Sequence, residues 1–549
     1  MHRLVLLLAL GGLAPAQVFD SYAVSTVMVP MRDGVKLATD IYLPARGGAA
    51  VGDRFPVLVY RSPYNKRGQR TESAFFAQRG YAVVAQDCRG RYASQGEFTP
   101  YASEGRDGYD TIEWAAAQAW SNGKVGTAGA SYLGLVQYLA AIEKPPHLLA
   151  MFALAAGSGA PMPGGVPDIG SDLWLVRMAL TSPRAPRVLG LEKLQEFQAD
   201  PGMVLKMSPG ERAALLRNFP SYYAAYETPQ SLAERYSRMK DVPIFFHSGW
   251  YDFQVEGLLE NFVTLSRLQK TPKKLMVGPW PHSAGAAECG DAWFGPRAAV
   301  EIRPLELDWF DHWLRQKEYQ IIKSDSVEYF RMGGGPGTRT AGGKLDHGGE
   351  WRTAASWPPA GGKPVRYYLQ AGGALSNAKP GAAPPSTYLF DPSNPVPTAG
   401  GRTRTAEKAP GCVQDQGRAS RADVLTFSTP PLARPLNVTG RMRAVILVSS
   451  DAPETDFTAK LIDLYPDGYA FPLNDGQIRT RYSAGQVHAV EIDLGSISNL
   501  FARGHRIRLD LSSSSYPKFE PNHSRPQARN SVWHDARHAS LLELPVPEP

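Results

Sequence analysis

Cysteine is scarce in this chain. The 549 residues include only three cysteines, Cys88, Cys289 and Cys412, and these are far apart in the sequence. Such spacing supplies neither a disulfide framework nor the ligands of a structural zinc site. In an exported protein two of them could pair, Cys289 with Cys412 being one option, and the odd count leaves one thiol free. Stability must therefore come from a buried core, for which the chain is long enough.

Long apolar runs are also missing, apart from a short one at the N-terminus. Arg3 precedes the apolar residues 4–10, and Ala14-Pro15-Ala16 fits the small-x-small cleavage rule of signal peptides. The run reaches only about half of the ~20 residues that a bilayer span needs. We therefore predict a cleaved signal peptide over residues 1–16, a secreted or periplasmic protein beginning near Gln17, and no membrane partner.

Charge of one sign does not dominate. The net charge is +7, and no dense basic stripe with interleaved aromatic residues occurs, so no nucleic-acid partner is expected. A phosphate-binding loop is absent too, because Gly343-Lys344 is followed by Leu345. Hydrophobic residues at 43% and charged residues at 20% predict a packed globular protein, and the length suggests two to four domains. The sequence calls for no cofactor and no metal.

The first part of the chain alternates strands with helices. Residues 24–43 predict a hairpin with its turn at Asp33-Gly34. Continuous apolar runs predict four buried strands, at residues 55–60, 81–87, 125–128 and 148–154. Residues 107–120 have helical spacing. This alternation predicts a mostly parallel sheet that is covered on both faces.

The later parts differ in pattern. Residues 157–240 are helical in character: Ser208, Pro209 and Glu211 indicate a helix start with a capping box, and Thr228-Pro229 indicates another that runs into residues 231–239. Strands resume at residues 242–249 and 274–280, and a helix follows at 305–316. After residue 323, many short alternating strands separated by turns predict an all-β sandwich.

Ser131 is the candidate nucleophile. It lies in "VGTAGASYLGLVQY", between a predicted strand and a helix over residues 132–142, with glycines at Gly129 and Gly134. A serine on such a turn is pushed out above the sheet, near the positive end of the helix. The usual pattern is G-x-S-x-G, whereas here the second glycine comes one position later. A structural turn serine is the alternative interpretation.

The candidate base and its orienting acid follow later strands. His282 comes just past the strand that ends near Gly278, and Asp252 lies in the loop after the preceding strand. The order serine, aspartate, histidine is that of α/β-hydrolases. Glu256 is the alternative acid. His247, within an apolar strand, is the alternative base, although a core histidine is the better interpretation of it.

Two groups could hold the oxyanion. The backbone N–H of Tyr132, directly after the nucleophile, is the first. The second should come from the loop after an early strand, "YRSPYNKRG", where the phenol O–H of Tyr64 is the candidate donor. A purely structural Tyr64 is the alternative.

Seven separated motifs resemble the CocE/NonD hydrolases, with their cocaine-esterase, α-amino-acid ester hydrolase and X-Pro dipeptidyl-peptidase branches. They are "RSPYNK", "QDCRGRYASQGEF", "GASYLG", "GWYD", "GPWPH", "WFDHWL" and "SSSSYPKFEPN". The elbow of that family is G-x-S-Y-x-G, which accounts for the displaced glycine. The resemblance implies Ser131, Asp252 and His282 as the triad, with Tyr64 and Tyr132 as the oxyanion hole.

The resemblance also implies the fold class, α/β with an α/β-hydrolase domain, an inserted helical cap and a C-terminal jelly roll. We assign the hydrolase domain to residues 17–156 and 241–322, the cap to 157–240 and the jelly roll to 323–549. Within "QDCRGRYASQGEF", the resemblance implies a structural loop, with Asp87 and Arg89 as a scaffold ion pair.

One departure bears on the substrate. In the α-amino-acid ester branch, acidic residues soon after the triad aspartate help to bind the ammonium group of the substrate. Here the matching residues are Phe253, Gln254 and Val255, with Glu256 close by. We therefore expect a serine hydrolase for a small-molecule acyl ester, with amides as a second class. The alternatives are an α-amino-acid ester hydrolase or X-Pro dipeptidyl-peptidase, and, outside enzymes, a secreted binding protein with an inactive hydrolase domain. The sequence does not indicate an oligomeric state.

Overall fold

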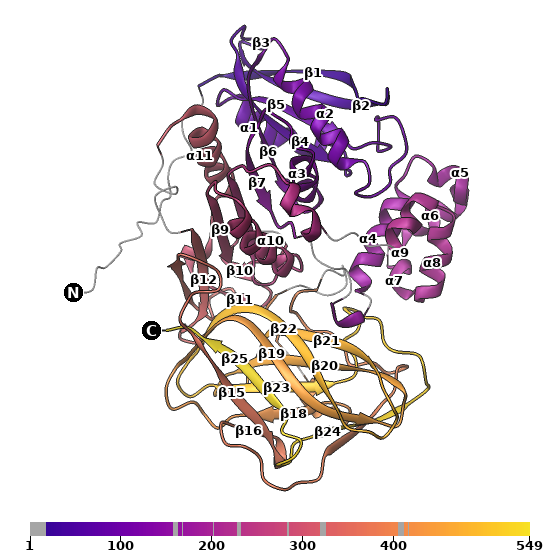
Figure 1. The fold of residues 1–549 in the computed structure, drawn as a ribbon, viewed down its shortest axis with the longest axis vertical. Coiled ribbons are helices and arrows are strands. Elements are labelled where there is room, and N and C mark those ends of the chain that lie inside the picture. Colours follow the sequence, from indigo (N-terminus) through magenta and orange to yellow (C-terminus); the bar gives the residue numbers. More distant parts are fainter. Residues whose placement is uncertain are drawn as a thin grey trace, which may run out of the picture.

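The computed structural model of the protein describes residues 18–157, 163–166, 168–200, 202–227, 232–282, 285–318, 326–403, 411–414 and 417–548. An α/β lobe and a lobe of strands lie at opposite ends, with a group of helices beside the region between them (Figure 1). The predicted signal peptide lies outside the described residues. Within the described ranges, no helix is long and apolar enough to cross a membrane.

The α/β lobe contains the predicted parallel sheet. Its strands run in the spatial order β5 (Ala82–Asp87), β4 (Phe55–Ser62), β6 (Ser121–Ala130), β7 (Leu148–Leu154), β8 (Ile244–Gly249) and β9 (Lys273–Gly278). The predicted hairpin is confirmed as β1 (Ser21–Pro30) and β2 (Lys36–Arg46), with β2 antiparallel to β5. Gly34 has φ 83° in its turn, a conformation that favours glycine.

Helices cover both faces of this sheet. They are α1 (Arg70–Ala77), α2 (Glu104–Ala116), α3 (Tyr132–Ile142), α10 (Val255–Leu268) and α11 (Ile302–Arg315). Along β4, Val57 and Val59 belong to the core shared with α2, α3 and α10, while Leu58 and Tyr60 belong to the core shared with α1 and α11. Because successive strand residues point to opposite faces, a strand buried on both sides must be apolar throughout, which is the pattern the sequence shows.

Short helices fill the interval assigned to the cap. They are α4 (Ile169–Leu180), α5 (Ala185–Leu189), α6 (Leu191–Ala199), α7 (Met203–Lys206), α8 (Pro209–Arg217) and α9 (Pro220–Glu227). The capping box predicted at Ser208 and Glu211 is confirmed at the start of α8. The helix start predicted at Thr228-Pro229 lies outside the described residues. The helix predicted to continue over residues 231–239 is present as the 3₁₀ helix η3 (Ala233–Arg238), and Met239 is already extended on the way to β8.

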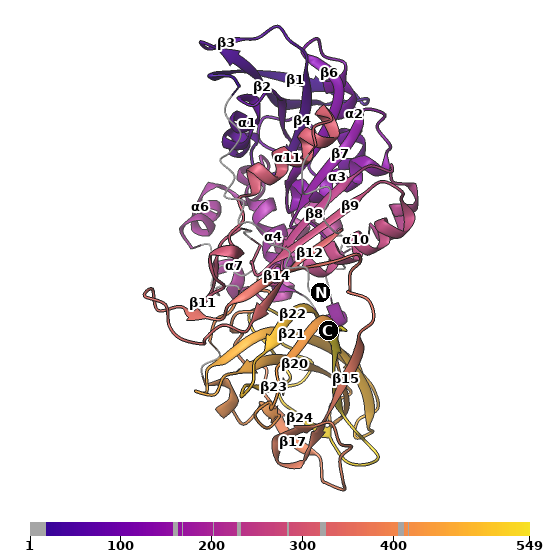
Figure 2. The same cartoon turned by 90° about the vertical axis from the view of Figure 1, so that its left-hand side faces the viewer.

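The C-terminal lobe is a jelly-roll sandwich of two layers (Figure 2). One layer contains β18 (Leu425–Ser428), β23 (Arg506–Ser512), β20 (Glu454–Leu464) and β21 (Ala470–Arg481). The other is built on β22 (His488–Phe501), β19 (Leu436–Ser450), β25 (Leu541–Val546) and β15 (Lys363–Gln370), with β24 (Ala528–Trp533) and β17 (Ser386–Phe390) alongside.

One strand joins the two lobes. β12 (Val327–Gly333) pairs with β9 of the hydrolase sheet, with β14 (Gly349–Ala354), and, through Met332 and Gly333, with β22 of the sandwich. The sheet of the hydrolase domain therefore continues past residue 323, the predicted start of the jelly roll.

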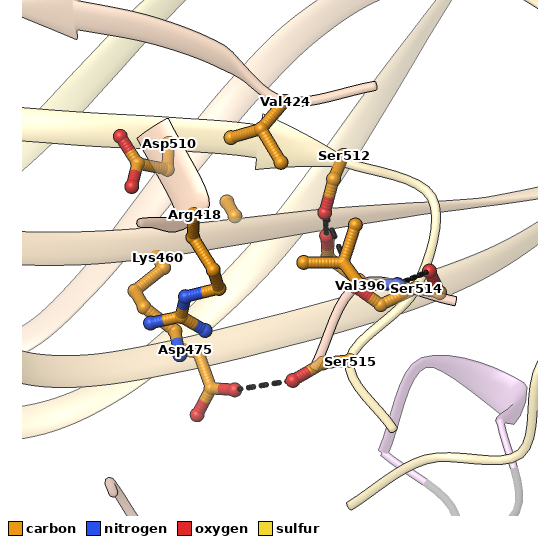
Figure 3. Close-up of a pocket in the computed structure, with 11 residues that line it drawn as sticks. Val396, Arg418, Val424, Lys460, Asp475, Asp510, Ser512, Ser514 and Ser515 are labelled. Atoms are coloured by element: carbon orange, nitrogen blue, oxygen red, sulfur yellow. Dashed lines mark hydrogen bonds between the residues drawn. The ribbon is translucent and has the colours of Figure 1, made fainter. Parts of the chain in front are cut away.

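The sandwich also has a small, partly open pocket (Figure 3). Its lining includes Arg418, Lys460, Asp475, Asp510 and the serines at 512, 514 and 515. The pocket measures about 20 Å³, which is room for a water molecule and too little for an ester. The chemistry must therefore be sought elsewhere.

Candidate active site

Ser131 lies on a strained turn. β6 ends at Ala130 and α3 begins at Tyr132, so the serine occupies the single residue between strand and helix. Its φ is 59° and its ψ −121°, a region that residues with a side chain rarely adopt. Its N–H donates to the carbonyl of Leu154 at the end of β7 (2.9 Å), which secures the turn. The strand-to-helix turn predicted around Ser131 is therefore present.

Steric crowding explains why the two positions around Ser131, Gly129 and Gly134, are glycines. Gly129 has φ 138°, and a Cβ there would lie 2.5 Å from the Cβ of Leu133. A Cβ on Gly134 would overlap the Cβ of Ala156, just beyond β7. The glycine three positions after the serine thus lets α3 pass close to the end of β7.

Asp252 and His282 are hydrogen bonded. The Nδ1 atom of His282 lies 2.8 Å from the Oδ1 atom of Asp252. The Asp252 side chain is fully buried, whereas the His282 side chain is 32% exposed. Asp252 also accepts hydrogen bonds from the Ser248 hydroxyl (2.8 Å) and the Gln254 N–H (2.9 Å). Burial alone would raise the pKa of Asp252, but His282 and these hydrogen bonds bring the pKa below its usual value.

Tight contacts hold the loops of Asp252 and His282 together. The N–H of Trp250 donates to Gly278 (2.9 Å), and the N–H of Tyr251 donates to Trp280 (3.0 Å). A Cβ on Gly249 would overlap the Trp280 backbone. The glycines of "GWYD" and "GPWPH" therefore allow the two loops to continue the pairing of β8 with β9. Since β6, β7, β8 and β9 are parallel neighbours, Ser131, Asp252 and His282 all follow carboxyl ends at one edge of the sheet.

The alternative base and acid have other environments. His247 is fully buried in β8, stacked on Trp280 with ring centroids 4.9 Å apart, and burial lowers its pKa to about 3. Glu256 accepts hydrogen bonds from Arg402 (2.6 Å) and from the Ser496 hydroxyl (2.9 Å), both in the C-terminal part of the chain. Arg402 also donates to the carbonyl of Trp250 (2.8 Å), so the cluster clamps the Asp252 loop.

Tyr64 touches the cap. It follows β4 and is exposed, and its phenol oxygen accepts a hydrogen bond of 2.9 Å from the indole Nε1–H of Trp174 in α4. Its ring meets the ring of Tyr132 edge-on, with centroids 6.4 Å apart. The two residues predicted for the oxyanion hole are therefore neighbours, and the cap contributes to their arrangement.

The side chain of Tyr132 anchors the start of α3. Its hydroxyl donates to Glu104 (3.0 Å) and accepts from the N–H of Tyr101 (3.1 Å). Its ring stacks on Tyr101 and Trp174, with centroids 5.1 and 5.6 Å away. Burial, and then the charge of Glu104, raise the pKa of Tyr132 well above its usual value, so the hydroxyl keeps its proton.

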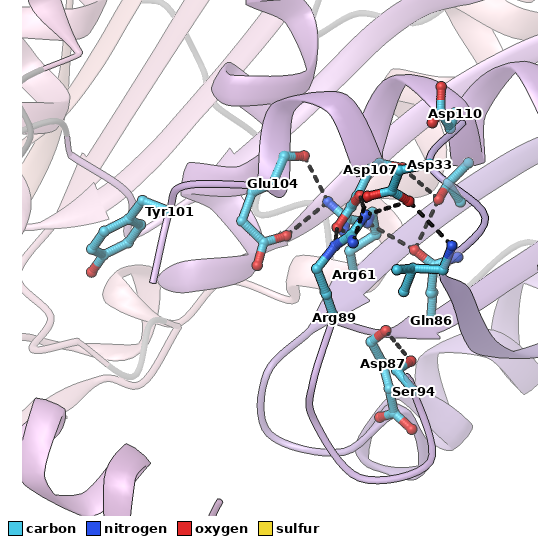
Figure 4. Close-up of polar contacts among 12 residues, drawn as sticks. Asp33, Arg61, Gln86, Asp87, Arg89, Ser94, Tyr101, Glu104, Asp107 and Asp110 are labelled. Carbon is cyan, nitrogen blue, oxygen red and sulfur yellow. Dashed lines mark hydrogen bonds and ion pairs between the residues drawn. The ribbon is translucent and has the colours of Figure 1, made fainter. Parts of the chain in front are cut away.

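Glu104, which accepts the Tyr132 hydroxyl, belongs to an ionic network that is largely buried (Figure 4). Arg61 pairs with Glu104 (2.9 Å), and Arg89 pairs with Asp107 (2.6 Å) and Asp33 (2.7 Å). The expected ion pair between Asp87 and Arg89 was wrong, because Asp87 instead accepts the N–H of Lys66 (2.6 Å). The loop is nevertheless tied to α2 and to the β1–β2 turn by Arg89.

The C-terminal lobe also holds the cap. Arg212 of α8 is buried and donates a hydrogen bond of 2.6 Å to Glu520, which lies within "SSSSYPKFEPN". A carboxylate oxygen of Asp172 in α4 lies 3.4 Å from the Nε atom of Arg212. Burial raises the pKa of Asp172 to about 6, although Arg212 opposes the shift. This cluster links the helix that carries Trp174 to the jelly roll.

Comparisons with known proteins agree with these observations. The X-Pro dipeptidyl-peptidase (S15 family) domain matches residues 33–284, and the X-Pro dipeptidyl-peptidase C-terminal non-catalytic domain matches residues 321–543. The chain is 34% identical over 584 residues to the cocaine esterase of Rhodococcus sp. (strain MB1 Bresler), with 95% of this chain and 98% of that protein covered. The chain belongs to the CocE/NonD family. It is a hydrolase of the CocE/NonD serine type.

Solved structures support the CocE/NonD fold. An aminopeptidase from the marine sediment archaeon Thaumarchaeota archaeon has a TM-score of 0.80 at 22% identity, with 98% of both chains covered. An α-amino acid ester hydrolase has a TM-score of 0.74 at 23% identity, with both chains fully covered. The fold class predicted from the sequence, an α/β-hydrolase domain with a helical cap and a C-terminal jelly roll, is confirmed.

Three residues of the candidate site could not be predicted from the sequence. They are Trp174, Tyr101 and Glu104, which surround Tyr132. Tyr101 and Glu104 lie shortly after the "QDCRGRYASQGEF" motif, and Trp174 lies on a helix without a motif. Their roles depend on contacts between distant segments, for which a single sequence carries no signal.

Proposed function

We propose that this CocE/NonD family member is an exported serine hydrolase that cleaves carboxylic esters, and secondarily amides, through an acyl-enzyme on Ser131. The observation that carries the proposal is the hydrogen bond between Asp252 and His282 at the sheet edge where Ser131 occupies a strained turn. The signal-peptide pattern of residues 1–16 supports export.

Acylation begins with Ser131 as the nucleophile. Asp252 occupies the Nδ1 side of His282, so the Nε2 atom is the one that takes the proton of the Ser131 hydroxyl. The serine oxygen then bonds to the ester carbonyl carbon. Asp252 remains ionised, since its pKa is low, and it stabilises the imidazolium that forms. His282 returns the proton to the departing alcohol, and the acyl group stays on Ser131.

The oxyanion of the tetrahedral intermediate needs donors placed in advance. The N–H of Tyr132 lies at the first turn of α3, where the helix dipole also favours negative charge. The phenol of Tyr64 is the second donor. Because Trp174 donates to the Tyr64 oxygen, the phenol acts as a donor toward the substrate with its oxygen held in place. Water then attacks the acyl-enzyme with His282 as base, which releases the acid and restores Ser131.

The residues after Asp252 favour a plain acyl ester. Phe253, Gln254 and Val255 carry no charge, and Glu256 is engaged by Arg402 and Ser496. A substrate ammonium would find no carboxylate there to bind it. Phe253 instead stacks on His282 with ring centroids 4.3 Å apart, and Trp174 and Tyr101 add further rings. These surfaces suit an apolar or aromatic acyl group.

Active-site labelling tests the proposal. A fluorophosphonate probe should label the wild-type chain at Ser131 and should not label Ser131→Ala. Failure of the wild type to label, or equal labelling of the variant, would favour an inactive hydrolase domain in a binding protein.

A substrate panel then separates the enzyme alternatives. We expect the highest kcat/KM for an aryl ester, compared with an α-amino-acid ester and an X-Pro anilide. Preference for the anilide would indicate a dipeptidyl-peptidase. Preference for the amino-acid ester would show that an ammonium anchor exists outside residues 253–256.

A further inference from the structure

Cys289 and Cys412 meet where the two lobes join. Cys289 ends β10 (Glu288–Cys289), which forms a hairpin with β11 (Ala292–Trp293) after the His282 loop. Cys412 lies in the segment 411–414, between the jelly-roll strands β17 and β18. Although 122 residues separate them in the sequence, both belong to one buried core.

Backbone contacts place the two segments against each other. The N–H of Asp291 donates to the carbonyl of Cys412 (2.9 Å), and the N–H of Gln414 donates to the Asp291 side chain (2.9 Å). A Cβ on Gly290 would lie 2.9 Å from the backbone nitrogen of Cys412. A Cβ on Gly411 would overlap the Sγ atom of Cys289. Each cysteine therefore has a neighbouring glycine that lets the other segment approach.

The sulfur of Cys289 lies against the backbone of Gly411, the residue before Cys412. Both cysteines are buried, and neither is in a disulfide in this structure. Burial raises the pKa of Cys412 well above its usual value, and a hydrogen bond with Cys289 adds to the shift. Cys88 lies elsewhere, beside Glu104 and Arg61, so it has no cysteine partner among the described residues.

We propose that Cys289 and Cys412 form a disulfide bond in an oxidising compartment, and that the bond fastens the segment after His282 to the C-terminal domain. The proposal goes beyond the hydrolase activity and does not depend on it. The two thiols release two protons and pass two electrons to the disulfide of a thiol–disulfide oxidoreductase, which becomes a dithiol.

The burial of the two thiols determines when their disulfide can form. The thiolate is the reactive species in thiol–disulfide exchange, and a buried thiol of raised pKa supplies little of it. We therefore expect oxidation during folding, before the core closes around Cys412. Once formed, the bond closes a long loop, which constrains the unfolded chain. It should raise Tm by roughly 5 °C.

The test uses the full chain made in two compartments. One preparation is directed to a bacterial periplasm by the signal peptide of the host, and the other is made without a leader in a reducing cytosol. Each is denatured, its free thiols are alkylated, and its peptides are analysed by mass spectrometry without reduction. We expect one alkylated cysteine, Cys88, and a linked Cys289–Cys412 peptide pair in the periplasmic chain, against three alkylated cysteines in the cytosolic chain. Three free thiols in the folded periplasmic chain, or a link through Cys88, would overturn the proposal.

Two variants complete the test. Cys88→Ser should keep the linked peptide, and Tm should fall by roughly 5 °C when it is reduced. Cys412→Ser should lack the linked peptide, and reductant should leave its Tm unchanged. An equal response of both variants to reductant would contradict the fastening role. If Cys412→Ser does not fold, Cys289→Ser provides the same comparison.

Discussion

The indole N–H of Trp174 donates a hydrogen bond of 2.9 Å to the phenol oxygen of Tyr64. Trp174 belongs to the cap, and Tyr64 belongs to the loop after the first parallel strand. A separate part of the chain therefore orients the proposed oxyanion donor of the hydrolase domain.

The phenol of Tyr64 should matter mainly for kcat. Tyr64→Phe removes one proposed oxyanion donor and leaves the ring, so kcat on an aryl ester should fall by about 10²–10³ with little change in KM. Steady-state kinetics will measure this, with fluorophosphonate labelling as a check that the site is folded. An unchanged kcat would assign Tyr64 a structural role.

Trp174 should act through Tyr64. Trp174→Phe removes the indole donor and keeps an aromatic ring, so kcat should fall by about 3- to 10-fold, as expected for one hydrogen bond of about 1 kcal/mol. In the Tyr64→Phe background the same substitution should have almost no further effect on kcat. Independent, multiplying effects would show that Trp174 contributes by contact with the substrate instead.

Gly134 should tolerate no side chain unless space is made for it. Alanine within a helix is ordinarily more stable than glycine by about 1 kcal/mol. Here Gly134→Ala should lower the free energy of unfolding by about 1–3 kcal/mol, because its Cβ would overlap that of Ala156. Urea denaturation will measure the loss. The double variant Gly134→Ala with Ala156→Gly should recover most of the loss, and no recovery would contradict the steric explanation.

Arg212 should be important for the attachment of the cap. Arg212→Ala leaves the buried carboxylates of Glu520 and Asp172 without their cation, at a cost of about 3–5 kcal/mol. The matched control is Lys193→Ala, which removes an exposed pair with Glu196 worth less than about 1 kcal/mol. Limited proteolysis within residues 168–227 and thermal unfolding will compare them. Equal stability of the two variants would show that the jelly roll does not hold the cap through Arg212.

Acid should destabilise the protein through its buried histidines. His347 is fully buried, with its Nδ1 atom 2.6 Å from the Tyr465 hydroxyl and its Nε2 atom 2.9 Å from the Oδ1 atom of Asn499. Burial lowers the pKa of His347 to about 4. The unfolded chain binds this proton near pH 6.5, so stability should be lost as pH falls from about 6.5 to 4, by up to about 3 kcal/mol.

The variant His347→Gln isolates that contribution. Its free energy of unfolding should depend less on pH between 7 and 4 than that of the wild type, when both are measured in urea. The control His523→Gln changes an exposed histidine and should keep the wild-type pH dependence. A wild-type slope in His347→Gln would assign the acid sensitivity to other groups, among them the buried His247.

The parallel sheet and the order of the candidate triad could be predicted from the sequence because both depend on local pattern. A strand buried on both faces is continuously apolar, and Ser131, Asp252 and His282 each lie shortly after such a strand. Trp174, Glu256 and Arg212 could not be assigned, since their partners come from other segments. Glu256 illustrates the limit: its carboxylate looked available for the active site, yet Arg402, 146 residues away, engages it.

The pairing of β12 with both β9 and β22 has a consequence for protein engineering. A chain that ended before β12 would leave β9 without its partner strand. The exposed edge of the sheet would then favour aggregation. Deleting the jelly roll would also remove Arg402, which binds the loop that carries Asp252, and Glu520, which binds the cap. A shortened catalytic fragment should thus be insoluble, and variants for practical use are better sought on the exposed loops of the whole protein.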